Sequence, residues 1–591
     1  MSAMRFFALC WNPIEGSAPQ IAPPSIARSP ADSWTIVLEK PGIVVWAAGP
    51  RRPALKWLAQ VQSLLIGDLY VGNRPASADQ FANACGEDPI SMARELATAC
   101  WGRYVAVLRP SNAIGPCVFR DPSGAVEALS WRSGKVTIVA STLPEFLLTA
   151  LPPNLSLDLQ QIASWLESPA AIAGASGLAG IHALAPGALS QPGKADIQVW
   201  RPLDWISARA PARDDVPRML EGVIDMVVGA LSSERQGILV EVSGGLDSSI
   251  VAAALAAAPN AKMMQWLNYR AASGEGDERF FARSLARELG FTLAEAEKPD
   301  YVLTECKLAA ISGGFRPGIS GLDCERDVDI GRRATVAGAD TIFTGQGGDM
   351  VFFQSPSALV AADLMHLEGL RGLADPSLVE TARWLRKSVW GLAMLAWKEG
   401  NGRKFPISGR SSFLAGRSDA TTAHPWLVGL EGAPPAKRLQ VRSLVEKLTL
   451  YGENRRSRVV DAVHPLLAQP IMELCLRTPT AVLTCGGRDR GLVRRAFSHR
   501  LPAAIASRRT KGSLGGYYAR TVAGSLAFLR PFLLEGRLSQ MKLIDVAHLE
   551  PLLTREQLII RGDYPSILFT ALVEAWVREW ERRISSLNGR S

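Results

Sequence analysis

Short apolar runs separated by turn residues fill the first 200 positions of the chain. Gly, Pro, Asp or Ser lies between many of these runs, a spacing that is typical of β-strands in a sheet-rich domain. We expect strands near positions 1–11, 34–39, 42–48, 67–71, 104–108, 116–120, 135–140 and 197–200. The N-terminal part is therefore predicted to be rich in sheet.

The pattern changes after position 215. An apolar run at 237–242 precedes an Ala-rich helix at 248–257, further strands are expected at 261–269 and 341–344, and a helix at 277–289. Strands that alternate with helices predict a parallel, doubly wound sheet with right-handed crossovers. From about 356 onward the pattern is mostly helical. The predicted fold class is α/β with two domains, at 1–205 and 216–591, joined by a linker at 207–215.

Composition and charge indicate where the protein is located and which classes of partner it binds. No run of about eighteen apolar residues occurs and the first residues do not read as an export signal, so we expect a cytoplasmic protein without a membrane span. The net charge of +9 is spread over 591 residues, with local concentrations at 455–458 and 488–511 but no basic stripe with interleaved aromatics. No nucleic-acid partner is therefore expected. Eight cysteines without a CxxC pair and six histidines without i, i+4 pairing give no metal-site pattern.

The motif SGGLDS at 243–248 follows the strand expected at 237–242 and opens the next helix. Paired glycines allow a tight turn close to an anion, and the first amides of the helix, with Ser243 and Ser248, point donors at it. No Lys follows the glycines, so this is not the GxxxxGK[ST] loop. The motif favours a pyrophosphate site and adenylation chemistry, although a plain strand-to-helix turn uses similar residues.

A second glycine-rich loop, GQGGD at 345–349, follows the strand expected at 341–344. In a parallel sheet two such loops meet at the carboxyl ends of their strands, where ligands bind. Asp247 and Asp349 could then share one Mg²⁺, because carboxylate oxygens are ligands that this ion prefers.

With these motifs the chain resembles the asparagine-synthetase-like ATP-dependent amide ligases, whose synthetase domain carries an SGGxDS pyrophosphate loop. Further family-like segments are WLN at 266–268, GDE at 276–278, HPLL at 464–467, LP at 501–502 and RRTKG at 508–512. The resemblance covers most of the chain. It implies a C-terminal domain of the ATP-pyrophosphatase type with a helical extension, in which Lys511 reaches the active site.

The N-terminal part resembles the family's Ntn-type glutaminase domain in WGRY at 101–104, FRDPSG at 119–124 and GIHALAPG at 180–187. Working domains of this type expose a catalytic Cys as the first residue of the mature chain. Here Ser2 follows Met1, and Cys10 lies in an apolar segment where a core role is expected. We interpret 1–205 as a degenerate glutaminase domain, and ordinary asparagine synthesis from glutamine is not expected.

Without ammonia, the nucleophile is expected to be an amine of the substrate itself. Two branches of the family fit such a loss: β-lactam synthetases, and lasso-peptide cyclases, which join a peptide's N-terminal amine to an Asp or Glu side chain. The second position of the glycine loop resembles a Tyr base in the β-lactam branch and is Glu in asparagine synthetases, whereas this chain has Gln346. A carboxamide cannot act as a general base but can orient a carbonyl or a phosphate. The resemblance therefore favours a lasso-peptide macrolactam synthetase.

The same resemblance implies ATP and Mg²⁺ as cofactors. Lys511 would stabilise negative charge on the adenylate and in the tetrahedral intermediate. Asp247, Asp349 and Gln346 complete the expected catalytic set, with the two carboxylates on the metal. The expected nucleotide-binding residues are Val242, Ser243, Gly244, Gly245, Asp247, Ser248, Trp266, Gly345, Gln346, Gly347 and Gly348.

The expected partners are a precursor (core) peptide and the leader-binding protein and leader peptidase of the same pathway. The helical region at 356–450, with Trp384, Trp390, Trp397 and Trp426, is long enough to help wall a wide substrate cavity. Three alternatives stay open: a β-lactam synthetase-like or other small-molecule amide ligase, a glutamine- or ammonia-dependent asparagine synthetase, and a non-catalytic scaffold.

Overall fold

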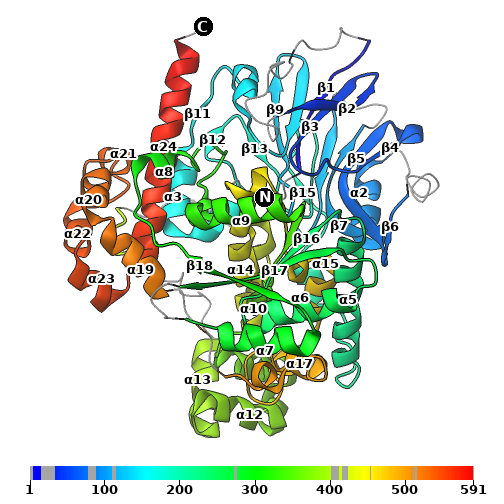
Figure 1. Cartoon of the computed structure of the whole chain (residues 1–591), viewed down its shortest axis with the longest axis vertical. Coiled ribbons are helices and arrows are strands. Elements are labelled where there is room, and N and C mark those ends of the chain that lie inside the picture. The colour runs from blue at the N-terminus through cyan, green and yellow to red at the C-terminus, as the bar shows by residue number, and fades with distance from the viewer. Residues whose placement is uncertain are drawn as a thin grey trace.

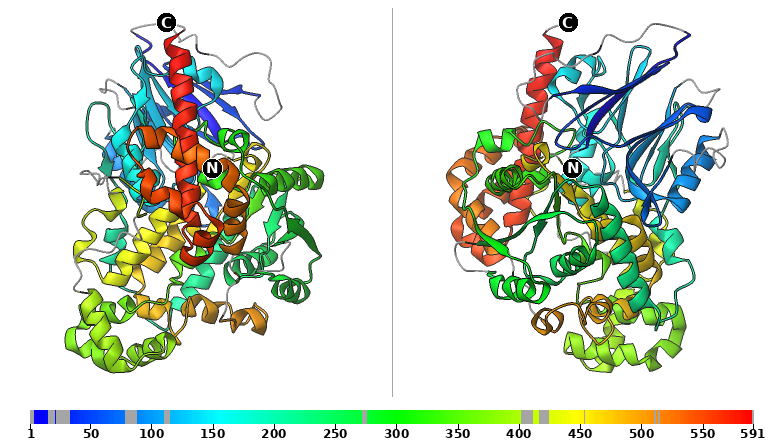
Figure 2. Two further views of the ribbon diagram at one scale, coloured as in Figure 1. Left: turned by 90° about the vertical axis from the view of Figure 1, so that its left-hand side faces the viewer. Right: turned by 45° about the vertical axis from the view of Figure 1, so that its right-hand side comes forward.

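Two antiparallel sheets make up most of the N-terminal part of the chain. The computed structural model describes residues 4–14, 21, 33–77, 88–109, 115–271, 276–400, 411–415, 424–452, 454–509, 512 and 515–589. One sheet has the strand order β13-β9-β10-β1-β3-β2, and the other has the order β15-β14-β8-β7-β5-β4 with β6 beside β5. Figure 1 and Figure 2 show these strands, coloured blue to cyan, in the upper part of the molecule.

The strands of the two sheets have the following bounds. They are β1 (Arg5–Cys10), β2 (Thr35–Lys40), β3 (Ile43–Ala48), β4 (Leu55–Leu58), β5 (Ser63–Val71), β6 (Arg74–Pro75), β7 (Trp101–Leu108), β8 (Cys117–Arg120), β9 (Leu129–Ser133), β10 (Val136–Ala140), β13 (His182–Ala183), β14 (Ala188–Ser190) and β15 (Ile197–Gln198). The remaining elements of this part are α2 (Pro89–Ala99), β11 (Ser156–Leu157), α3 (Leu159–Glu167), β12 (Leu178–Ala179) and α4 (Pro202–Ile206).

Alternating side chains join the inner faces of the two sheets into one core. Phe6 and Ala8 of β1 belong to the same buried cluster as Ile66 of β5 and Val105 of β7. Each strand expected from the apolar runs overlaps a strand of the structure, so the sheet-rich prediction is confirmed. The sequence did not predict five strands of these sheets: β4, β6, β9, β13 and β14.

A five-stranded parallel sheet forms the centre of the C-terminal part. Its order is β18-β17-β16-β19-β20, and every neighbouring pair is parallel. The strands are β16 (Ile238–Glu241), β17 (Met263–Ala271), β18 (Leu293–Lys298), β19 (Thr341–Phe343) and β20 (Asp461–Val463). The chain builds β17 and β18 on one side of β16 and then places β19 on the other. The carboxyl ends of β16 and β19 therefore form a topological switch point, where ligands bind in open α/β sheets.

Helices cover both faces of this sheet, as the alternating pattern predicts. Val240 packs in one cluster with residues of α6 (Leu246–Ala257) and α7 (Arg279–Leu289). Its neighbour Leu239 points to the other face and packs with Ile330 and Ala334 of α9 (Cys324–Ala337). The other helices before β19 are α5 (Val216–Ser233) and α8 (Glu305–Ala309).

Helices dominate the chain after β19, which confirms the helical extension. They are α10 (Gly348–Val351), α11 (Leu359–Glu368), α12 (Pro376–Leu385), α13 (Val389–Gly400), α14 (Pro435–Lys447), α15 (Gln469–Arg477), α16 (Thr480–Leu483), α17 (Gly491–Ala496), α18 (Ala503–Ala506), α19 (Gly515–Gly524), α20 (Leu526–Leu534), α21 (Arg537–Gln540), α22 (Val546–Leu549), α23 (Arg555–Arg561) and α24 (Tyr564–Asn588). The last of these, α24, packs against α19 and α20 and reaches α3 and β11 of the N-terminal part (Figure 1). Among the described helices, none combines the length and apolar content needed to cross a membrane.

Two buried ion networks fix the N-terminal sheets to the C-terminal part. In the first, Asp68 Oδ2 of β5 lies 2.6 Å from Arg103 Nη2 and 2.7 Å from Arg235 Nη2. Arg103 Nη2 also lies 2.7 Å from Asp461 Oδ2 of β20. Because all four side chains are buried, the network links β5 and β7 to the edge of the parallel sheet.

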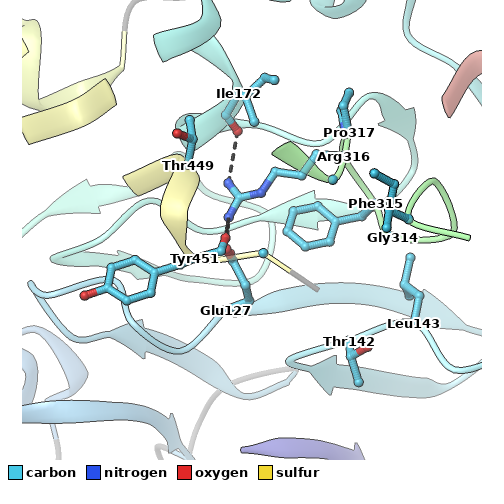
Figure 3. A pocket seen from close by; sticks show the side chains of 13 residues that line it. Glu127, Thr142, Leu143, Ile172, Gly314, Phe315, Arg316, Pro317, Thr449 and Tyr451 are labelled. Carbon is cyan, nitrogen blue, oxygen red and sulfur yellow. Dashed lines mark hydrogen bonds and ion pairs between the residues drawn. The ribbon is translucent and has the colours of Figure 1, made fainter. Parts of the chain in front are cut away.

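The second network surrounds Glu127. Arg316, which follows α8, pairs with Glu127, and Arg120 Nη2 lies 3.0 Å from Glu127 Oε2. Arg316 Nη1 donates to the Ile172 carbonyl at 3.0 Å, and Nη2 donates to the Tyr451 carbonyl at 3.2 Å. Figure 3 shows the Arg316 side chain between these two residues. The adjoining cavity measures about 20 Å³, enough for about one water molecule. This part of the boundary is closely packed.

Candidate active site

The loop between β16 and α6 has the form of a phosphate-binding turn. Gly244 has φ +86°, and a Cβ there would lie 2.5 Å from the Glu278 carbonyl oxygen, so the turn requires Gly. Ser243 Oγ lies 2.9 Å from Ser248 Oγ, which also accepts the Ser243 amide at 3.2 Å. Gly245 is the N-cap of α6. Two hydroxyls are thus grouped at the positive end of a helix dipole, which suits a phosphate group.

The second glycine loop lies directly against the first. A Cβ at Gly345 would lie 2.3 Å from the Ser248 amide nitrogen, and one at Gly348 would lie 2.6 Å from Asp247 Cγ. Gly347, with φ +91°, is the N-cap of α10, which begins one residue before Asp349. The absence of side chains at 345 and 348 therefore allows the two loops to touch.

Asp247 and Asp349 lie in one cluster of opposite charges. Asp247 Oδ2 lies 2.7 Å from Arg490 Nη1, and Asp349 Oδ2 lies 3.8 Å from Lys447 Nζ. Burial alone would lower the pKa of Arg490, but the carboxylates of Asp247, Asp489 and Asp349 raise it above its ordinary value. Arg490 is consequently a permanent cation between the two loops.

This donor set fits Mg²⁺ in the way that nucleotide enzymes hold it. Mg²⁺ takes oxygen ligands, and one or two carboxylates usually share it with phosphate oxygens and water. Within the described part of the chain, no group of three or more His, Cys, Asp and Glu side chains forms a complete metal cage. Two carboxylates beside a phosphate-binding type of loop match a site in which protein carboxylates and phosphate oxygens bind the same Mg²⁺ ion.

Basic residues between 488 and 511 contribute to the site, although the sequence did not single out any of them except Lys511. Arg490 adopts φ +51° at the N-cap of α17, and Arg494 Nη2 lies 3.0 Å from Asp489 Oδ2. The sequence showed that this segment is basic. It did not show which acidic residues the arginines contact, because Asp247 lies 243 positions before Arg490.

Lys511 lies outside the described residues, so its role stays a prediction. The residues on either side of it bind one carboxylate: Arg508 Nη2 at 2.7 Å and the Gly512 amide at 2.8 Å from Glu278 Oε1. Arg508 Nη1 also donates to the Gly244 carbonyl at 3.4 Å. The described neighbours of Lys511 therefore lie beside the SGGLDS loop.

The sequence profile of asparagine synthase matches residues 228–580, a span that runs from α5 into α24 and includes both glycine loops. The chain belongs to the asparagine synthase family. A comparison with curated proteins gave no match. Family membership supports an ATP-dependent amide ligase in general, while the domain limits 1–205 and 216–591 stay predictions.

Two expected nucleotide contacts in this family member have side chains packed in the core. Val242 is buried, and its carbonyl accepts the side-chain amide of Asn268 at 2.7 Å, a contact that the sequence did not predict. The Trp266 ring stacks on Phe291 with centroids 4.0 Å apart. Nucleotide binding by Val242 and Trp266 therefore stays a prediction.

A cavity of about 540 Å³ lies beside the start of the two loops. Glu241, Thr344 and Gln346 line it at the carboxyl ends of β16 and β19. Asp323, Arg326 and Asp327 line a wall beside α9, and α24 supplies a largely apolar wall with Tyr564, Pro565, Leu568, Phe569 and Leu572. A ligand here would meet ionisable groups at one side and apolar side chains at the other.

The helical region at 356–450 helps to wall this cavity, as expected, but only through its last residues. Only Glu446, Thr449 and Leu450 from that region are among its described lining residues. Trp426 is buried in the core, whereas Trp390 and Trp397 are 80% and 65% exposed on α13. Figure 1 shows α12 and α13 at the lower end of the molecule. Most of this region, α12 and α13 included, therefore supplies none of the described lining residues.

Burial shifts the pKa of His464, which lines the cavity, and of Lys298, which contacts the lining residue Asp323. Asp323 Oδ2 accepts Lys298 Nζ and the Tyr518 hydroxyl, both at 3.0 Å, and burial lowers the pKa of Lys298. His464 Nδ1 lies 2.7 Å from Thr344 Oγ1. Burial, assisted by the charge of Arg456, holds the pKa of His464 well below its ordinary value. His464 is therefore a neutral imidazole and a weak proton acceptor.

Cys10 is buried in β1, and the core role expected for it is confirmed. Burial raises the pKa of the Cys10 thiol to about 12. Since the thiolate is the nucleophilic form, this cysteine is unsuited to glutamine hydrolysis at neutral pH.

Proposed function

We propose that the chain is an ATP-dependent, AMP-forming amide ligase that closes a macrolactam in lasso-peptide biosynthesis. The observation that carries the proposal is the contact of the two glycine loops at the switch point, beside a cavity that opens at Gln346. That cavity combines ionisable groups with an apolar wall. A peptide end that bears an amine has both features.

In the proposed reaction ATP is a substrate. Ser243, Gly244, Gly245 and Ser248 would bind the β- and γ-phosphates, which leave together as pyrophosphate. An Asp or Glu carboxylate of the peptide attacks the α-phosphorus and forms an acyl-adenylate. The N-terminal amine then attacks the acyl carbon, a C–N bond forms, the C–O bond to AMP breaks, and AMP departs.

The remaining residues would bind charge or orient groups. Asp247 and Asp349 would hold Mg²⁺, which neutralises charge on the triphosphate when bound. Gln346 would orient the reacting carbonyl or a phosphate, since a carboxamide donates and accepts hydrogen bonds but has no useful basicity. Lys511 would stabilise charge on the adenylate and in the tetrahedral intermediate.

The buried Cys10 supports a nucleophile that comes from the substrate itself. Its raised thiol pKa argues against a glutaminase reaction that would supply ammonia through this residue. An intramolecular amine needs no such supply. The proposed partners are accordingly a precursor peptide, with a leader-binding protein and a leader peptidase that deliver it.

A small-molecule amide ligase is the second candidate, and the cavity volume favours it. About 540 Å³ is the size of a small-ligand site. A prefolded peptide would place only its ring-closing end inside the cavity. A small substrate would therefore lie wholly inside the cavity, whereas most of a peptide substrate would lie outside it.

Mass spectrometry of the full chain with ATP, Mg²⁺, the precursor peptide encoded beside its gene and the leader peptidase tests the proposal. We expect a core peptide lighter by one water, resistant to carboxypeptidase, together with AMP. AMP release with free amino acids or small carboxylates, without a dehydrated peptide, would contradict the macrolactam synthetase and support the small-molecule amide ligase.

A further inference from the structure

Asp327 is a buried carboxylate on the wall of the cavity. It lies in the first turn of α9, is 1% exposed, and its amide donates to the Asp323 carbonyl at 2.9 Å. Its Oδ1 lies 3.6 Å from Nη1 of Arg456, which belongs to a short 3-10 helix, Arg456–Arg458. Its Oδ2 has no hydrogen-bond partner among the described residues. A buried polar oxygen without a partner is costly unless a ligand satisfies it.

The other acidic side chains that line the cavity each have a closer cation. They pair as Asp323 with Lys298 at 3.0 Å, Glu241 with Arg326 at 2.7 Å, and Glu446 with Arg442 at 3.4 Å. His464 lines the cavity as well, but it is a weak proton acceptor. Asp327 is thus the lining carboxylate best placed to receive a cation from a ligand.

Burial, together with the charges around Asp327, sets the pKa of its carboxyl group. Burial raises the pKa of Asp327 to about 6, Arg456 and Arg326 oppose the rise, and Asp323 adds to it. At neutral pH the group is mostly ionised, yet it accepts a proton more readily than an ordinary Asp. A carboxylate with this pKa is suited to general base catalysis near neutral pH.

We propose that Asp327 binds the ammonium group of the substrate amine and takes its proton before the amide bond forms. This inference rests on the proposed function, because it names the group that prepares the nucleophile in that reaction. The apolar wall from α24, with Leu568 and Phe569, suits a primary amine that carries an apolar body. The ligand class is therefore an amphipathic primary amine, such as the N-terminal end of a peptide.

The proton balance of the step is complete. An N–H bond of the ammonium breaks, its proton moves to Asp327 Oδ2, and the freed lone pair attacks the acyl carbon. The nitrogen loses its second proton to water as AMP leaves. Asp327 returns its own proton to solvent when the product departs.

A binding experiment tests the site without depending on turnover. The probe is 2-phenylethylamine, a primary amine with an apolar body, titrated calorimetrically into the full chain. Asp327→Asn keeps the shape of the side chain but cannot be ionised, and we expect it to bind the probe at least about tenfold more weakly. Glu325→Gln is the matched control, because Glu325 lies on the same helical turn, pairs with Lys307 at 2.9 Å and is not a lining residue. Equal binding by Asp327→Asn and wild type, or no binding to wild type, would overturn the inference.

A kinetic experiment tests the role of Asp327 as base. Hydroxylamine is neutral at neutral pH, so it traps the acyl-adenylate without first giving up a proton. For Asp327→Asn we expect trapping within about twofold of wild type, macrolactam formation at least about 100-fold slower, and loss of the acidic limb near pH 6. Trapping and ring closure that fall together would show that Asp327 does not prepare the amine.

Thermal unfolding checks that the variant folds. The folded-state pKa of Asp327 lies above its unfolded value, so the group stabilises the fold at low pH and that contribution is lost as pH rises through about 6. Asn removes the charged form, so the Tm of Asp327→Asn at pH 8 should equal or exceed that of wild type.

The outcomes separate the two proposals. If wild type binds 2-phenylethylamine through Asp327 but forms no macrolactam, the cyclase function fails and the amine site stands. If wild type closes the ring and Asp327→Asn closes it equally fast, the function stands and the role of Asp327 fails.

Discussion

Arg490 adopts a left-handed backbone conformation at the point where it reaches Asp247. Its φ is +51°, and its guanidinium Nη1 lies 2.7 Å from Asp247 Oδ2. A non-glycine residue in this region costs about 1–2 kcal/mol. The charge-assisted contact with the buried Asp247 carboxylate offsets that cost. Without Arg490 this carboxylate would be buried without a cationic partner.

Replacing Arg490 by Met should destabilise the fold and abolish AMP formation. Loss of one partner from a buried ion pair typically costs about 3–5 kcal/mol. Urea unfolding at pH 7 measures the stability, and Arg495→Met is the control because Arg495 is exposed on the same helix, α17. A stability loss no greater than that of Arg495→Met would contradict the role given to Arg490.

The sequence predicted the residues of the glycine loops but not their partners. Spacing along the chain reveals a turn such as SGGLDS, since its geometry is set within a few residues. Contacts such as Arg490 with Asp247, or Arg508 with Glu278, join distant segments through the fold. No local pattern encodes them.

At the scale of elements, the candidate site depends on the close approach of two loops. Gly345→Ala should disrupt it, because the new Cβ would lie 2.3 Å from the Ser248 amide nitrogen, a backbone atom that cannot yield. We expect loss of adenylation and a stability decrease above about 1 kcal/mol, as for other overpacked sites.

Gly222→Ala is the matched control for this prediction. Gly222 lies in the middle of α5, and a Cβ there would meet nothing within 4 Å. It should raise stability by about 0.5–1 kcal/mol and leave activity unchanged, because Ala is the better helix former. Full activity in Gly345→Ala would mean that the loops do not need to touch.

The alternation of strands and helices was sufficient to predict the parallel sheet, but two of its strands were not predicted. The β18 sequence LAEAEK is charged, because this strand lies at the sheet edge, and β20 has only three residues. The walls of the cavity come from α9, α14 and α24 as well as from the sheet. The hydrophobic periodicity of a helix predicts that the helix forms, but not which distant helices meet at one cavity.

At the scale of the whole molecule, the Asp68 network joins the N-terminal sheets to the parallel sheet. Burial alone would raise the pKa of Asp68, but Arg235, Arg103 and Arg51 hold it well below its usual range. Its stabilising contribution is therefore present above the unfolded-state pKa of about 3.9 and is lost as pH falls through the lower folded-state value.

Asp68→Asn should lower the free energy of unfolding by about 3–5 kcal/mol at pH 7, because it leaves buried guanidiniums without their counter-charge. The control is Asp204→Asn, whose pair with Arg201 is half exposed and should contribute less than about 1 kcal/mol. Unfolding followed by near-ultraviolet circular dichroism measures both. Similar small effects from the two variants would mean that the network does not hold the two parts together.

The most direct test of the central claim is to identify the nucleotide products when the full chain turns over ATP with Mg²⁺ and the precursor peptide, using phosphorus NMR. A pyrophosphate-releasing site at Ser243–Ser248 predicts AMP and pyrophosphate, with both products lost in Asp247→Asn and in Asp349→Asn. ADP and inorganic phosphate, or unchanged AMP formation by either variant, would contradict the account.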